Sequence, residues 1–288
     1  MKKIYNNAIV FTGIFTGLLL SSCRQGNGSQ NTAAVADTLH AAAQEDKHTE
    51  DTVAYMLPSP MQIGVIFRRA GLSYMPGLTN QTKDISKYDS KYSQALNMGI
   101  YAADLTYCVL NRQNEDAMSY LKTLRSLADK LGFGSVFEIN NMAKRFEQNL
   151  NTEDSLTDIT SDLQMETDTY LGANNEKYIG AISFAGAWIE SMYIGSKVYG
   201  AKTNDRISDR ISEQMTILNN LIKSLNSYSG RESHTPELVN ALNAIESTYS
   251  SFPEVKSTGD SNQEAKLTNE HISQIGKQIE DLRQKFIS

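Results

Sequence analysis

The sequence predicts an all-α protein, built from antiparallel helical hairpins in two related halves that form a helical bundle or a short helical-repeat array. Three observations predict it. Apolar residues recur every three or four positions over most of the chain after residue 56, which is the spacing of amphipathic helices. No proline occurs between Pro76 and Pro236, so long uninterrupted helices are allowed. No stretch of useful length alternates with the period of two typical of strands.

Two stretches, residues 91–110 and 177–199, are apolar on nearly every side, so each should form a buried helix. The two stretches align when one is shifted by 177 − 91 = 86 positions. In this alignment, Asp104 corresponds to Glu190. A similar order of three amphipathic helices follows each stretch. We therefore expect an internal duplication with one central helix in each half.

The first helix is predicted from its start signals. Ser59 is a good N-cap, Pro60 suits the first helical position, and Gln62 completes a capping box. This helix should stop at Gly71, and residues 72–86 should form a loop that packs on the body. Apolar spacing predicts about nine helices in all, the others lying at residues 118–131, 139–150, 156–170, 207–225, 235–249 and 267–286.

The N-terminus has the features of a targeting segment. Lys2 and Lys3 precede an apolar run at residues 8–20, which is shorter than the roughly 20 residues needed to span a bilayer. The following Leu20-Ser21-Ser22-Cys23 resembles a bacterial lipobox. This resemblance implies cleavage before Cys23, lipidation of its thiol, and a stable membrane anchor through several acyl chains.

Three regions follow from this interpretation. Residues 1–22 are the expected lipoprotein signal peptide. Residues 23–52 contain almost no large apolar side chains and are expected to form a flexible polar tether. Residues 53–288 are expected to form the helical domain, with repeats at 88–172 and 175–288.

Several motifs place the chain near a known family. These are Leu57-Pro58-Ser59-Pro60 before an apolar helix, then Lys87-Tyr88, then the run from Ala95 to Leu105. Together with the lipobox they resemble a family of uncharacterised lipoproteins from Bacteroidetes, over roughly residues 56–131. The resemblance implies an exported all-α domain and brings no activity or catalytic residues with it.

Two threonines of the tether are candidates for modification. Asp37-Thr38-Leu39 and Asp51-Thr52-Val53 are similar to the O-glycan acceptor pattern of secreted proteins in the same phylum. A disordered segment is accessible to a modifying enzyme. We therefore expect O-glycosylation at Thr38 and Thr52.

Asp104 and Glu190 are the acidic residues inside the two most apolar helices, and a buried carboxylate is costly unless it is paired or hydrogen-bonded. One interpretation is that they meet near the centre and form a binding site, either for a metal ion or as an acid–base pair. The other is structural: each accepts a hydrogen bond from a tyrosine or pairs with a neighbouring base. The aromatic side chains expected nearby, and expected to line a cavity between the central helices, are Tyr101, Tyr107, Tyr178, Trp188 and Tyr193.

Composition and motif searches exclude several functions. The chain has 27 basic and 33 acidic residues with both signs dispersed, which argues against a nucleic-acid partner. No HExxH, CxxC, GxSxG or P-loop motif occurs, so we predict neither an enzyme nor a cofactor or metal site. Cys108, the second cysteine, is expected to be a buried core residue.

The predicted function is that of a cell-envelope lipoprotein that binds a protein or polymer partner through its helical body. The alternative is a helical domain that binds a small molecule or lipid in the tyrosine-lined cavity. Arg24-Gln25-Gly26-Asn27 lacks the acidic cluster associated with surface export in this phylum. This favours an outer-membrane anchor facing the periplasm, with surface exposure as the alternative.

Overall fold

The computed structural model describes residues 57–82, 85–258 and 265–288, all within the compact unit Thr52–Ser288. Every regular element among these residues is helical, so the all-α prediction is confirmed. The helices are α1 (Pro60–Arg69), α2 (Lys91–Leu110), α3 (Asn114–Leu131), α4 (Met142–Gln148), α5 (Glu153–Ala173), α6 (Lys177–Ala201), α7 (Asp205–Ser227), α8 (Thr235–Ser251), α9 (Pro253–Thr258) and α10 (Asn269–Ile287). Two 3-10 helices, η1 (Ile85–Lys87) and η2 (Gly134–Asn141), join them.

The predictions for the N-terminal regions concern residues outside the described part. These are the signal peptide 1–22, the tether 23–52, lipidation of Cys23, and glycosylation of Thr38 and Thr52. They stay predictions. Within the described residues, no helix is both long enough and apolar enough to span a membrane.

The central helices α2 and α6 cross in direct backbone contact. A Cβ atom on Gly99 of α2 would lie 1.6 Å from the Ser183 carbonyl oxygen, and one on Gly186 of α6 would lie 1.9 Å from the Leu96 carbonyl oxygen. The two contacts are reciprocal, since 186 − 99 and 183 − 96 both equal 87. Glycine is required at both positions because any side chain would push the helices apart.

The two central helices run in the same general direction. Lys91, the first residue of α2, lies 3.5 Å from Glu176, which precedes α6. Beyond the crossing, Asp104 of α2 meets Glu190 of α6. Both helices are buried on most sides, as their apolar sequences predict.

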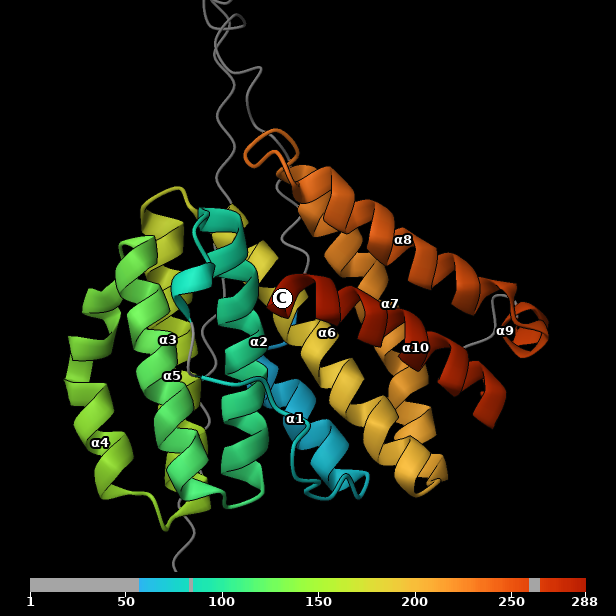
Figure 1. The fold of residues 1–288 in the computed structure, drawn as a ribbon, viewed down its shortest axis with the longest axis horizontal. Coiled ribbons are helices and arrows are strands. Elements are labelled where there is room, and N and C mark those ends of the chain that lie inside the picture. The colour runs from blue at the N-terminus through green and yellow to red at the C-terminus, as the bar shows by residue number, and fades with distance from the viewer. Residues whose placement is uncertain (1–56, 83–84, 259–264) are drawn as a thin grey trace, which may run out of the picture. The chain divides into compact units, whose positions relative to one another are not determined.

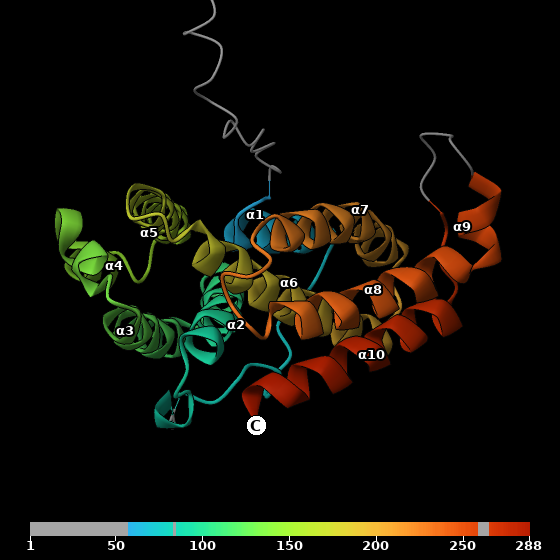
Figure 2. The same cartoon turned by 90° about the horizontal axis from the view of Figure 1, so that it is seen from above.

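The helices on the two sides of this central pair follow the same packing order (Figures 1 and 2). On one side, α3 pairs with α2 as a hairpin, and α4 leads to α5, which returns to contact both central helices. On the other side, α7 pairs with α6, and α8 leads through α9 to α10, which also contacts both central helices. The shared order agrees with two related halves, and the internal duplication itself stays a prediction.

The first helix begins as predicted. The Ser59 hydroxyl accepts a hydrogen bond from the Gln62 amide, and the Gln62 side chain accepts one from the Ser59 amide, which completes the capping box. The helix ends before Gly71, whose φ of +97° is in the left-handed region. α1 packs on both central helices and places its N-terminus beside α5.

The predicted helix at residues 139–150 is the clearest error in the element predictions. Ile139 is extended and 39% exposed, and Asn140 and Asn141 have positive φ values. The chain therefore turns sharply between η2 and α4, and the helix covers only Met142–Gln148. The apolar spacing hides this turn, although asparagine tolerates the left-handed conformation. The short helix α9 has no periodic apolar signal and was also not expected.

Candidate functional site

Asp104 and Glu190, the two acids expected near the centre, are brought together and are completely buried. One Asp104 oxygen, Oδ2, accepts a hydrogen bond from the backbone amide of Asn80 at 3.0 Å. The other oxygen, Oδ1, has no hydrogen-bond donor among the described residues. The carboxyl groups of Asp104 and Glu190 interact, and each shifts the pKa of the other.

Arg283 of α10 supplies the positive charge of this cluster. Its guanidinium binds both oxygens of Glu190 from Nε and Nη2, with the Nη2–Oε1 distance at 2.8 Å. Nη2 also donates to the Leu78 carbonyl at 3.3 Å, and the guanidinium lies 4.2 Å from the Tyr193 ring centroid. A bidentate arginine–carboxylate pair of this kind fixes the relative orientation of the two side chains and neutralises the carboxylate charge.

The acid pair holds a proton on Asp104. Burial raises the pKa of both carboxyl groups. For Glu190, the bonds from Arg283 and from Asp104 act in the opposite direction. The pKa of Asp104 is raised well above its ordinary value by burial and then by the negative charge of Glu190. We therefore assign the proton to Asp104, as the neutral acid that donates to the Glu190 carboxylate.

The same cluster fastens the loop of residues 72–82 to the helices. Besides the bonds to Asn80 and Leu78, the Tyr120 hydroxyl donates to the Asn80 carbonyl at 2.8 Å, and the Tyr101 hydroxyl donates to the Gln81 carbonyl at 2.7 Å. The Tyr107 hydroxyl donates to the Ser73 carbonyl at 3.2 Å and accepts from the Met75 amide at 2.6 Å. The acids and tyrosines therefore hold this loop against the helices through hydrogen bonds.

The five aromatic residues expected to line a cavity are mostly packed into the protein interior. Tyr101 and Trp188 are completely buried, and Tyr107 is nearly so, with a pKa raised to about 12 by burial. Tyr178 and Tyr193 are half-buried. Tyr107 borders a small hollow of about 30 Å³. Tyr101 and Tyr107 anchor the loop and Trp188 fills the core, and none of the five residues lines the cavity described below. A tyrosine-lined cavity stays a prediction.

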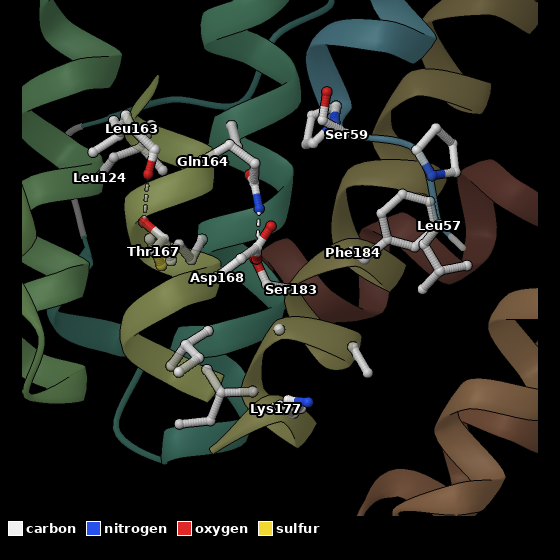
Figure 3. Close-up of a pocket in the computed structure, with 18 of the residues that line it drawn as sticks. Leu57, Ser59, Leu124, Leu163, Gln164, Thr167, Asp168, Lys177, Ser183 and Phe184 are labelled. Atoms are coloured by element: carbon white, nitrogen blue, oxygen red, sulfur yellow. Dashed lines mark hydrogen bonds between the residues drawn. The ribbon is translucent and has the colours of Figure 1, made fainter. Parts of the chain in front are cut away.

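A cavity of about 460 Å³ lies between α5, the central helices and the segment that enters α1 (Figure 3). This volume is within the range of about 300–1,000 Å³ typical of small-molecule sites. The lining is mostly apolar. Its main apolar side chains are Leu57, Met98, Leu105, Leu163, Ile179 and Phe184.

A few polar groups interrupt the apolar wall. In Figure 3, Gln164 and Asp168 project from α5, with the Gln164 amide donating to Asp168 Oδ1 at 3.0 Å. Asp168 is exposed overall, yet the cavity wall removes enough water from its carboxyl group to raise its pKa. Ser183 of α6 also lines the cavity, and the Thr167 hydroxyl donates to the Leu163 carbonyl.

The mouth of the cavity is formed by α1 and α5. Four residues line both the cavity and a second, outer hollow: Ser59, which caps α1, Gln62 of α1, and Gln164 and Asp168 of α5. The outer hollow is completed by other residues of α5. A ligand would therefore enter between these two helices and pass a polar rim before reaching the apolar interior.

Other reactive groups are not arranged for chemistry in the described part. Cys108 is free and buried, and burial raises the pKa of its thiol, so it remains a neutral core side chain. No group of three or more His, Cys, Asp or Glu side chains is clustered to hold a metal ion among the described residues.

Sequence reasoning missed Arg283 and the cavity. A signal for Arg283 existed: it follows Ile275 and Ile279 at helical spacing, so a basic residue stands in the apolar stripe of its helix. Gln164 and Asp168 similarly repeat at a spacing of four beside the apolar stripe of α5. Neither pattern predicts which residues these side chains contact, because those residues lie far away along the chain.

Comparisons of this chain with protein-family models, with curated proteins and with solved structures find no match.

Proposed function

We propose that this chain is a lipid-anchored protein of the cell envelope whose helical body binds a small, mainly apolar molecule in the cavity between α1, α5 and the central helices. The observation that carries this proposal is the cavity itself, with its volume of about 460 Å³, apolar walls and polar rim. Sites for small ligands combine an apolar lining with a few placed polar groups in this way.

The envelope location is supported by the sequence alone. A basic start, an apolar run and Leu20-Ser21-Ser22-Cys23 follow one another in the order of a lipoprotein signal. The resemblance to Bacteroidetes lipoproteins and the residues after Cys23 favour an outer-membrane anchor facing the periplasm. A polar tether of residues 23–52 would allow the body to receive or deliver a ligand near the membrane.

A titration with the neutral apolar dye N-phenyl-1-naphthylamine tests the binding function. The protein used is residues 23–288 with Cys23→Ser, so that no lipid is attached. We expect saturable binding of one dye molecule per chain. Ala181→Phe on α6 and Ala102→Phe on α2 each add a ring to a residue of the cavity wall and should weaken binding at least about tenfold.

Ala201→Phe makes the same change at the exposed end of α6 and should leave dye binding unchanged. Circular dichroism confirms that each variant folds. Binding that does not saturate, or that is equally strong in the folded cavity variants and the control, would refute the proposal.

A further inference from the structure

Asp168 is the acidic residue of the cavity wall and lies at its mouth. Its only hydrogen bond among the described residues comes from the neutral amide of Gln164, which engages Oδ1. No arginine, lysine or histidine forms an ion pair with it in the described part of the chain. Oδ2 is therefore available to a ligand, and a carboxylate is a strong acceptor for a cationic donor.

The helix that carries Asp168 gives the mouth a negative potential. Every charged residue of α5 is acidic: Glu153, Asp154, Asp158, Asp162, Glu166 and Asp168. Within the part of the chain that the structure describes, Glu153 and Asp162 form ion pairs, with Arg112 and Arg145, and the other four acids form none. A cleft lined by one sign of charge attracts ligands of the opposite sign and repels those of the same sign.

The other groups at the cavity do not create an anion site at the mouth. At the start of α1, Pro60 has no amide hydrogen, and the Gln62 amide is already bonded to the Ser59 hydroxyl. The N-terminus of this helix therefore has fewer free amides than an anion site needs. Lys177 lines the cavity but not the outer hollow at the mouth.

We infer that the ligand is an amphiphile with an apolar body and one cationic nitrogen, the nitrogen bound by Asp168 at the mouth and the body held among the apolar side chains inside. This inference rests on the proposed function and specifies its ligand class. A carboxylate-headed amphiphile, such as a fatty acid, should be rejected because its charge would face Asp168 and the rest of α5.

Displacement of the bound dye by decylamine, decanol and decanoate tests the inference, because these probes share one chain length and differ in the polar end. The protein is residues 23–288 with Cys23→Ser, at about 0.15 M salt to screen distant charges. Decylamine should bind at least about tenfold more tightly than decanol, as expected for a charge-assisted hydrogen bond. Decanoate should bind more weakly than decanol.

Asp168→Asn should remove the preference for decylamine over decanol. Asp158→Asn is the matched control: it removes the same charge from an exposed position of α5 that does not line the cavity, so the preference should persist. Equal or tighter binding of decanoate, or a decylamine preference that survives Asp168→Asn, would overturn the inference. If the dye binds but only the head-group preference is absent, the proposed cavity function stands; if neither dye nor any probe binds, the function itself fails.

Discussion

At the residue scale, one proton explains how Asp104, Glu190 and Arg283 can be buried together. An unpaired buried charge is strongly unfavourable. With Asp104 neutral, the remaining carboxylate of Glu190 is balanced by the Arg283 guanidinium, and the cluster carries no net charge. The two acids that look equivalent in the sequence therefore have different roles: Glu190 is the ion-pair partner, and Asp104 is a hydrogen-bonding neutral acid.

Amide substitutions should distinguish these roles. Asp104→Asn keeps an acceptor for the Asn80 amide and a donor for Glu190, so we expect a free energy of unfolding within about 1 kcal/mol of wild type at pH 7. Glu190→Gln leaves the buried Arg283 without its counter-charge and should cost about 3–5 kcal/mol. Urea denaturation measures both values. Equal and large losses for the two variants would show that Asp104 is ionised.

The same assignment predicts the sign of a pH dependence. The folded pKa of Asp104 is raised above its unfolded value of about 3.9, so its stabilising contribution is complete below that pH and is lost as the pH rises through the folded pKa. Asp104→Asn lacks this titration. Between pH 4.5 and pH 8, the unfolding free energy of the variant minus that of wild type should therefore increase as the pH rises. A decrease of this difference would contradict the assignment.

At the scale of elements, the crossing of α2 and α6 depends on two glycines rather than on large apolar side chains. The carbonyl oxygens facing Gly99 and Gly186 belong to helix backbones, which cannot move aside as a flexible side chain can. Closely packed interiors resist added atoms at such points. The two contacts therefore fix the distance between the two central helices.

Alanine substitutions test this crossing. Gly99→Ala places a methyl group against the Ser183 carbonyl and should destabilise the protein by about 1–3 kcal/mol or more. Gly200→Ala is the matched control on α6, because a Cβ atom there has no neighbour within 4 Å. It should be neutral or stabilising by up to about 1 kcal/mol. Thermal unfolding in which both variants behave alike would show that the crossing is not tightly packed.

Elements with a local signal could be predicted from the sequence. The apolar run and the Ser59 capping box predict α2 and the start of α1, since these depend on neighbouring residues. The pairing of Glu190 with Arg283 spans 93 positions and could not be predicted, because helical spacing does not specify which faces meet. The turn at Asn140 and Asn141 was missed because the apolar period continues across it.

At the scale of the whole body, the cavity is formed where helices far apart in the sequence meet. α2, α5 and α6 contribute to its walls, and the segment entering α1 contributes Leu57 and Ser59. No single stretch of sequence contains enough of these walls to predict the cavity. The five aromatic residues expected to line a ligand space do not line this cavity, whose walls are mainly aliphatic side chains and phenylalanine, with Tyr228 at the end of α7.

The central claim is that this cavity holds a ligand in the native protein. Native mass spectrometry of the full-length chain, isolated from its own membrane in a mild detergent, tests it most directly. The account predicts one small organic molecule bound per chain of wild type and none on the folded Ala181→Phe variant, whose new ring occupies the cavity. No added mass on wild type, or the same added mass on both proteins, would contradict it.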